Sequence, residues 1–173
     1  LLAHRVHESA KNLLFLDVGT NGEMALRAGG VTYACATAAG PAFEGARISC
    51  GMRAATGAII AVDAGSSDVL ITTLDNTPPR GLCGTGLLDA VAVLLDLGIV
   101  DETGRMLEPE ELRAACPDLP EAALRRVILD RNGPAFILAE ATAESPRVTL
   151  TQRDVREFQL AKGAVAAGWT VML

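Results

Sequence analysis

The sequence predicts a mixed α/β fold that forms a single lobe. Strand patterns cluster in the first part of the chain and join as hairpins, whereas the strongest helix patterns come later. Half of the 173 residues are apolar, yet the aromatic residues are only four Phe, one Tyr and one Trp. The core must therefore be built from Ala, Val, Leu and Ile, which suits close packing of helices on strands.

Five strand patterns fill the first half of the chain. The apolar run that ends at Asp17 predicts a buried strand, and the pair Asn21-Gly22 is typical of a hairpin turn into a second strand. A double glycine at 29–30 leads into a third strand rich in β-branched residues. The glycine-bracketed segment 39–45 predicts a loop that begins a short helix. We expect the strands at 13–18, 23–28, 31–36, 57–63 and 68–74.

The second half is dominated by helix signals. An amphipathic pattern over 86–97 stops at Gly98, which is typical of a helix C-terminus. Thr151 and Asp154 resemble a capping box that opens a long helix, with Phe158 and Trp169 in its core-facing positions. Residues 1–10 have the pattern of the last turns of a helix. The remaining expected elements are a short helix at 109–115, a hairpin of strands 127–130 and 135–138, and a short strand at 148–150.

Composition excludes several classes of function. The net charge of −6 and the pI of about 4.9 argue against nucleic acid or an anionic membrane as the main partner. The sequence has no uninterrupted apolar run of about 18 residues, so we expect no membrane span. The four cysteines contain no C-x-x-C pair, which favours reduced thiols in a cytoplasmic protein over a zinc or iron–sulfur site.

The segment 17–23 is the strongest candidate for chemistry. A strand delivers the Asp17 carboxylate to its end, and the glycines that follow can adopt positive φ, which lets several N–H groups point into one concavity. Such a turn suits a phosphate chain with a divalent cation, with Asp17 holding Mg²⁺ through its water shell. The alternative is an ordinary hairpin with an exposed Asp and no ligand. The predicted nucleotide-binding residues of this turn are Gly19, Thr20, Asn21, Gly22 and Glu23.

Two further glycine-containing turns lie near predicted strand ends. One contains Gly40 and Glu44, and the other places Gly84, Thr85 and Gly86 at a helix N-terminus, where unpaired N–H groups favour phosphate. If all three turns meet at one edge of a sheet, they form a nucleotide cradle, in which Asp17 and Glu44 are the candidate catalytic carboxylates. Taken separately, the segment 84–86 can be an ordinary start of a helix, and Asp17 and Glu44 can be ordinary solvated carboxylates.

Five motifs in order resemble one protein family, the reductive activators of corrinoid proteins and their ferredoxin-linked relatives. The similarity extends over nearly the whole chain and stays collinear. The matching segments are DVGTNGE at 17–23, AAGPAFEGA at 38–46, CGMRAA at 50–55, GLCGTGLLDA at 81–90, and TQRDVRE at 151–157 followed by QLAK at 159–162.

The resemblance implies part of an actin-like ATPase lobe, a mixed sheet with hairpins and flanking helices. In that scheme 17–23 is similar to the second phosphate-binding hairpin, and 151–173 to a connecting helix. The family also implies ATP and Mg²⁺ in the full-length protein, a [2Fe–2S] cluster in a domain outside this chain, and a corrinoid protein as partner. ATP would help that cluster to reduce Co(II) corrinoid to Co(I).

The chain departs from the family pattern in what it lacks. The first phosphate hairpin, the adenine loop and the iron–sulfur domain have no counterpart in the sequence. We therefore expect residues 1–173 to be a single partial domain, with 101–150 as an insertion or subdomain, and its exposed apolar ends to favour a homodimer. Two other functions stay open: a lobe of a small-molecule kinase of the same fold, and a non-catalytic docking lobe.

Overall fold

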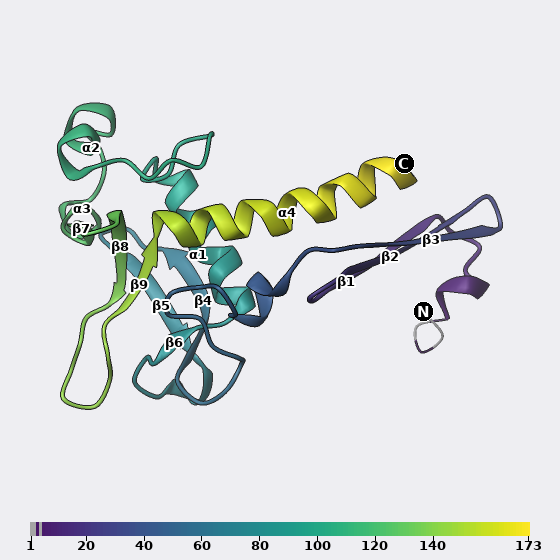
Figure 1. The fold of residues 1–173 in the computed structure, drawn as a ribbon, viewed down its shortest axis with the longest axis horizontal. Coiled ribbons are helices and arrows are strands. Elements are labelled where there is room, and N and C mark those ends of the chain that lie inside the picture. The colour runs from purple at the N-terminus through teal and green to yellow at the C-terminus, as the bar shows by residue number, and fades with distance from the viewer. Residues whose placement is uncertain (1–2, 4) are drawn as a thin grey trace.

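A computed structural model describes residue 3 and residues 5–173, in which three small sheets are packed with helices (Figure 1). The first sheet is an antiparallel meander of β1 (Leu13–Val18), β2 (Gly22–Ala28) and β3 (Val31–Thr37). The three predicted strands are thus confirmed. This sheet extends away from the rest of the molecule, with α4 along one of its faces (Figure 1).

The prediction that β1 is buried is wrong for this structure. The sheet order is β1-β2-β3, so β1 lies at an edge, and the side chains of Leu13, Leu16 and Val18 are exposed. The buried positions of this sheet fall instead on β2, where Met24 and Ala25 are almost inaccessible. Apolar residues on successive positions predicted burial on both faces, but the described part of the chain supplies only one neighbouring strand.

The predicted helix tail at the N-terminus is also wrong where it can be examined. Residues 1, 2 and 4 lie outside the described residues, and η1 (Val6–Glu8) is a single 3₁₀ turn. Arg5 has a left-handed backbone with φ of 50°, and Ser9 is extended, so no α-helix can run through this segment.

The second sheet combines a hairpin with one parallel strand. β4 (Ala58–Ala64) pairs antiparallel with β5 (Val69–Thr73) and parallel with the short β6 (Gly81–Leu82). The 3₁₀ turn η3 (Leu74–Asn76) follows β5, and α1 (Gly84–Asp96) packs on β4. As predicted, the amphipathic pattern forms a helix, which begins two residues earlier than expected.

The third sheet is the antiparallel set β7 (Val127–Asp130), β8 (Gly133–Ala139) and β9 (Val148–Thr151). It is preceded by α2 (Pro109–Ala115) and α3 (Glu121–Arg125), of which only α2 was predicted. The guanidinium of Arg126 fixes this sheet to the β4–β5 hairpin by two hydrogen bonds to Asp68 and by bonds to the carbonyls of Ile137 and Leu138.

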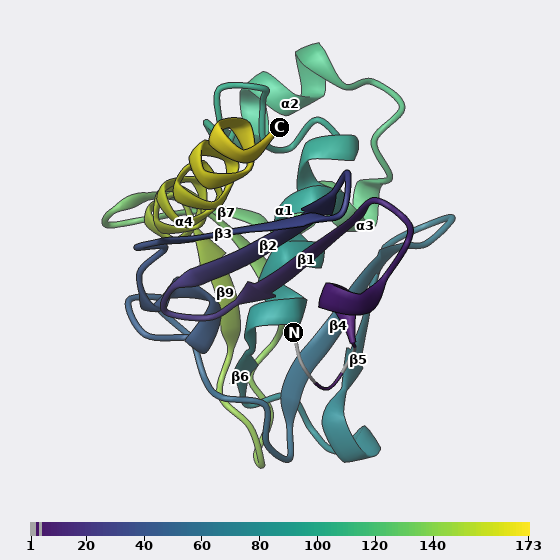
Figure 2. The same cartoon turned by 90° about the vertical axis from the view of Figure 1, so that its right-hand side faces the viewer.

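The long helix α4 (Gln152–Met172) runs from the third sheet across the first (Figures 1 and 2). Its capping box is confirmed, because Thr151 accepts a bond from the Asp154 N–H and Asp154 accepts from the Thr151 N–H. Phe158 is buried as expected, but Trp169 is 43% exposed and is not a core residue.

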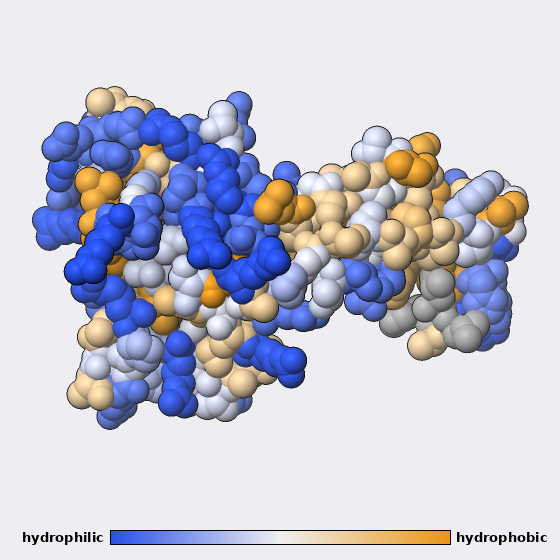
Figure 3. Space-filling model, in the orientation of Figure 1, coloured by the Kyte–Doolittle hydropathy of each residue, from blue (hydrophilic) through white to orange (hydrophobic). Residues whose placement is uncertain are grey.

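One hydrophobic core connects the second and third sheets, α1 and the first half of α4. Its largest fully buried members include Phe136, Ile59, Leu87 and Leu94. In Figure 3 strongly hydrophilic side chains cover much of that part of the molecule, while apolar and neutral ones gather along the end of α4 and the first sheet. The described residues include no helix that is long and apolar enough to cross a membrane.

Candidate functional site

The turn between β1 and β2 has a shape that the sequence did not predict. Val18 pairs with Gly22, so three residues, Gly19 to Asn21, form the loop, and the N–H of Gly19 donates to the carbonyl of Asn21 at 2.9 Å. The expected hairpin between the first two strands is confirmed, but no residue from 17 to 23 has positive φ, so the expectation that its glycines use positive φ is wrong. Gly22 is instead the first residue of β2.

Gly22 is explained by close packing. A Cβ at this position would lie 2.9 Å from the Thr37 hydroxyl oxygen and 3.1 Å from a methyl group of Val165. Both distances are shorter than ordinary contacts, so any larger residue would push β3 or α4 away. The glycine therefore lets α4 lie directly on the sheet at the base of the turn.

The segment that contains Gly40 and Glu44 is bonded directly to this turn. Pro41–Glu44 forms the 3₁₀ helix η2, flanked by Gly40 and Gly45, both with positive φ. The backbone N–H and the hydroxyl of Thr20 both donate to Glu44 Oε1, at 3.1 and 2.5 Å. The N–H of Gly40 donates to the carbonyl of Thr20 at 2.8 Å. The structure thus brings the first two predicted turns together.

The third turn meets the same segment through the backbone. A Cβ at Gly84 would lie only 2.1 Å from the Phe43 carbonyl oxygen, and one at Gly86 only 2.2 Å from that of Ile59. Only glycine lets the start of α1 approach η2 and β4 so closely. Packing thus accounts for both glycines, and their contact with phosphate stays a prediction.

The hydroxyl of Thr85 already has a partner inside the protein. The β4–β5 register shifts between Ile59 and Ala61, and Thr85 Oγ1 donates to the carbonyl of Ile60 at 2.8 Å. This bond ties the first turn of α1 to the irregular part of β4. A phosphate contact through this hydroxyl would require that bond to be shared.

Two carboxylates lie side by side near the turn. Asp17 on β1 is directly opposite Glu23 on β2, and both residues are exposed. Like charges facing each other across a strand pair are destabilising, so a cation nearby would relieve their repulsion. Within the described residues no group of three His, Cys, Asp or Glu side chains could hold a metal by itself. Magnesium would therefore need oxygen atoms from water or a ligand.

An apolar cavity of about 720 Å³ lies beside the turn, between α1 and α4. Val18 and Phe43 line its end nearest the turn, Leu88 and Leu95 its α1 wall, and Phe158 and Trp169 its α4 wall. The volume is within the range of small-molecule pockets, about 300–1,000 Å³. No sequence pattern indicated this cavity, because its walls come from helices whose relative placement depends on the whole fold.

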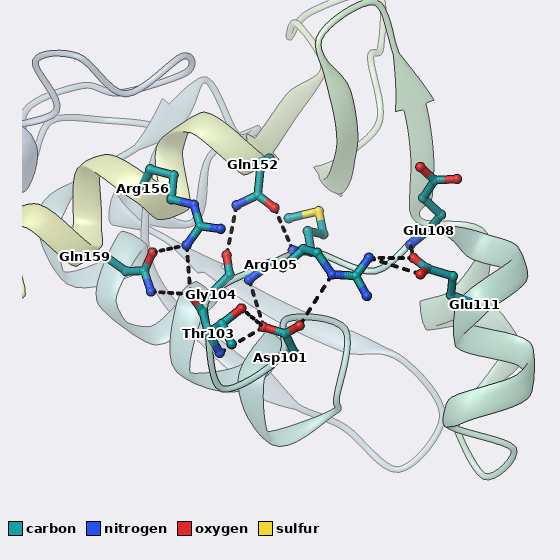
Figure 4. Close-up of polar contacts among 10 residues, drawn as sticks. Asp101, Thr103, Gly104, Arg105, Glu108, Glu111, Gln152, Arg156 and Gln159 are labelled. Atoms are coloured by element: carbon teal, nitrogen blue, oxygen red, sulfur yellow. Dashed lines mark hydrogen bonds and ion pairs between the residues drawn. The ribbon is translucent and has the colours of Figure 1, made fainter.

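A polar network fixes the remaining wall of the cavity, the turn 101–105 (Figure 4). Asp101 Oδ1 accepts bonds from the Thr103 hydroxyl and from the N–H groups of Thr103 and Arg105. These bonds, that of the Thr103 hydroxyl first, hold the pKa of Asp101 below its usual value. Three side chains one or two turns apart on α4 then bind carbonyl and amide groups of this loop: Gln152, Arg156 and Gln159.

The fold and these contacts define the class of the domain. Among solved structures, a reductive activator for corrinoid, iron-sulfur protein superimposes with a TM-score of 0.84 and 36% identity, over 99% of this chain and 26% of that chain. The fold is that of an actin-like, or ASKHA, domain. A family model described as the C-terminal domain of RACo, the ASKHA domain, matches residues 11–173. The chain belongs to this family.

Curated relatives agree with this assignment. The chain is 35% identical over 161 residues to the corrinoid activation enzyme RamQ of Eubacterium limosum, covering 91% of this chain and 26% of that protein. It is 28% identical over 182 residues to the Co(II) methylated amine-specific corrinoid protein reductase of Methanosarcina barkeri, covering 92% of this chain and 28% of that protein. The chain therefore spans about a quarter of the length of these relatives.

Proposed function

We propose that this chain is one lobe of an ATP-dependent reductive activator of corrinoid proteins, and that its β1–β2 turn binds the terminal phosphates of ATP. The observation that carries the proposal is the direct bonding of Thr20 to Glu44 and to Gly40, which joins two of the three predicted phosphate segments. The similar proteins, whose names all concern corrinoid activation or reduction, support the general function.

The residues of the turn fit a phosphate with a divalent cation. In the described part of the chain, the N–H of Asn21 has no acceptor, and the first N–H groups of α1 have none within their helix. Among the residues that the structure describes, the adjoining carboxylates of Asp17 and Glu23 form no ion pair, so they can orient the water shell of Mg²⁺.

In this proposal each part of the site has a separate task. Asp17 positions the Mg²⁺-bound or attacking water, and within the segment from Gly19 to Gly22 the N–H of Asn21 faces the phosphate oxygens. Glu44 holds the turn through Thr20 and can share in orienting water. In the whole protein, ATP binding and hydrolysis would offset an unfavourable electron transfer from a [2Fe–2S] domain to Co(II) corrinoid.

The Asp17 carboxylate provides the test. In the full-length protein we expect Asp17→Asn to lower ATP turnover by about 10²–10⁴-fold, the range for a positioned acid–base group. Asp63→Asn, a change of an equally exposed carboxylate on β4, should leave turnover unchanged. Steady-state phosphate release measures both. Turnover of Asp17→Asn within threefold of wild type would remove Asp17 from the mechanism.

Hydrogen–deuterium exchange separates this function from a non-catalytic docking lobe. If the turn binds ATP, adding ATP and Mg²⁺ to the full-length protein should slow exchange in residues 17–23. Unchanged exchange there, with binding to a corrinoid protein retained, would favour docking. A small-molecule kinase would instead transfer the phosphate to an added sugar or acid, which a product assay would show.

A further inference from the structure

Asp154 is a buried carboxylate that the proposed chemistry does not use. Its residue is completely inaccessible, and it is the only charged residue so deeply buried among those that the structure describes. No cation pairs with it within that part of the chain. Burying an ionised carboxylate is costly unless hydrogen bonds satisfy its oxygens, so its contacts need a reason.

Helix capping accounts for the hydrogen bonds of only one of the two carboxylate oxygens of Asp154. Oδ2 accepts from the N–H and hydroxyl of Thr151, at 2.9 and 2.8 Å, as in a capping box. Oδ1 accepts instead from the N–H and hydroxyl of Ser49, at 2.8 and 3.1 Å, across 105 positions of sequence. The second oxygen therefore anchors a distant loop to the first turn of α4.

The loop that contains Ser49 is continuous with the helix that carries Glu44, and it has little freedom to move. A Cβ at Gly51 would lie 1.9 Å from the Gly45 carbonyl oxygen, so the two ends of the segment 45–51 are in direct contact. The ring of Phe43 meets that of Phe158 edge to face at 5.9 Å between centroids. Residues 43–51 thus form a rigid unit that rests on the first two turns of α4.

We propose that Asp154 is a positioning residue for the phosphate-binding turn, acting through Ser49 and the rigid segment 43–51 on the Glu44–Thr20 contact. The effect on catalysis rests on the proposed function, whereas the effect on the turn does not. The N–H of Thr20 donates to Glu44, so its exchange with solvent reports where Glu44 lies whether or not ATP is a ligand.

Three variants of the full-length protein separate positioning from capping. Asp154→Asn keeps one acceptor oxygen and gains an amide group that only donates, so it cannot accept from Ser49 and from Thr151 at once. Ser49→Ala loses the hydroxyl bond to Asp154 and the hydroxyl contact with Thr151 but keeps its N–H bond to Asp154. Thr151→Ala is the matched control, because it weakens the helix cap and removes only the long hydroxyl contact of 3.4 Å with Ser49, while both bonds from Ser49 to Asp154 stay intact. Its cost is about 1 kcal/mol for a lost cap, which the melting temperature reports.

Hydrogen–deuterium exchange of residues 18–22 is the first measurement. We expect faster exchange in Asp154→Asn and in Ser49→Ala, and exchange as in wild type in Thr151→Ala. Equal acceleration in all three variants, or none in Asp154→Asn, would overturn the positioning role.

ATP kinetics are the second measurement. We expect Asp154→Asn to lower kcat/KM by up to about 10²-fold, the effect of a displacement of about 1 Å. On a Glu44→Ala background, in which Thr20 has lost its side-chain acceptor, it should have little further effect, whereas an additive loss would contradict action through Glu44. If Asp17→Asn leaves ATP turnover unchanged, the proposed function of the turn fails, and the exchange data still decide whether Asp154 positions it.

Discussion

At the scale of single residues, two glycines contribute to stability in opposite directions. Gly51 is in contact with the Gly45 carbonyl, so the segment that carries Glu44 can close only without a side chain there. Gly163 lies on an exposed face of α4, and a Cβ there would meet nothing within 4 Å. Packing thus requires the first glycine, whereas the second only lowers the stability of the helix.

We expect Gly51→Ala and Gly163→Ala to shift stability in opposite directions. Gly51→Ala should lower the free energy of unfolding by about 1–3 kcal/mol, because the methyl group overlaps backbone. Gly163→Ala should raise the free energy of unfolding by about 0.5–1 kcal/mol, because alanine lowers the backbone entropy of the unfolded chain. Chemical unfolding monitored by circular dichroism measures both. A neutral Gly51→Ala would mean that the loop opens easily.

Sequence patterns predicted local features well at this scale and distant ones poorly. The capping box joins Thr151 and Asp154, which are three positions apart, and the structure contains it as predicted. The bonds from Ser49 to Asp154 and from Thr20 to Glu44 join residues far apart, and no periodicity indicates them. The pair Asn21-Gly22 suggested a turn with positive φ. The same pair also fits a loop in which the glycine is needed because a side chain would have no space.

At the scale of elements, the Asp68–Arg126 pair joins two hairpins that lie far apart in sequence. Both side chains are less than one third exposed, and Arg126 also binds two carbonyls of β8. The hydrogen bonds from Arg126, more than any other cause, hold the pKa of Asp68 below its usual 3.8. The pKa of Asp68 is lower in the folded state than in the unfolded chain. The pair therefore stabilises the fold at pH values above the pKa of Asp68 in the unfolded chain. This stabilisation is lost as the pH falls through the pKa of Asp68 in the folded state.

We therefore expect Asp68→Asn to lower the free energy of unfolding by about 1–3 kcal/mol at pH 7. The difference from wild type should shrink below about pH 4, where Asp68 of the unfolded chain begins to bind a proton, and disappear at lower pH, once the folded carboxylate is protonated too. Glu121→Gln, which breaks the exposed Arg125–Glu121 pair, is the control and should cost about 0–1 kcal/mol. Urea unfolding at several pH values measures this. A constant difference down to pH 2 would contradict it.

Elements were predicted more reliably than their burial. All three strands of the first sheet lie where the pattern placed them, but β1 is exposed because burial depends on neighbours that a local pattern does not specify. Likewise α3 was missed because its five residues are too few for a periodic signal. The helix α4 was predicted because its cap and its apolar repeat agree.

At the scale of the whole molecule, half-exposed apolar side chains from two helices converge on the cavity beside the turn. Leu88 is 50%, Leu95 45% and Trp169 43% exposed, and all three line the cavity. A contiguous apolar surface of this kind favours association. We therefore expect residues 1–173, prepared alone, to form concentration-dependent homodimers that light scattering can detect.

Charges placed in the cavity should abolish that association. The double variant Leu88→Lys and Leu95→Lys should be monomeric at concentrations at which the parent chain is dimeric. The control is Leu70→Lys with Leu129→Lys, which changes two somewhat more exposed leucines that do not line the cavity. If both double variants behave alike, another surface mediates the contact.

Trp169 offers a practical use of this arrangement. It is the only tryptophan of the chain, and its indole stands half in solvent and half against the cavity wall. Its fluorescence emission should therefore shift to shorter wavelength when anything fills the space beside it. The chain thus carries a built-in optical probe, which needs no label and reports occupancy of the cavity separately from events at the turn.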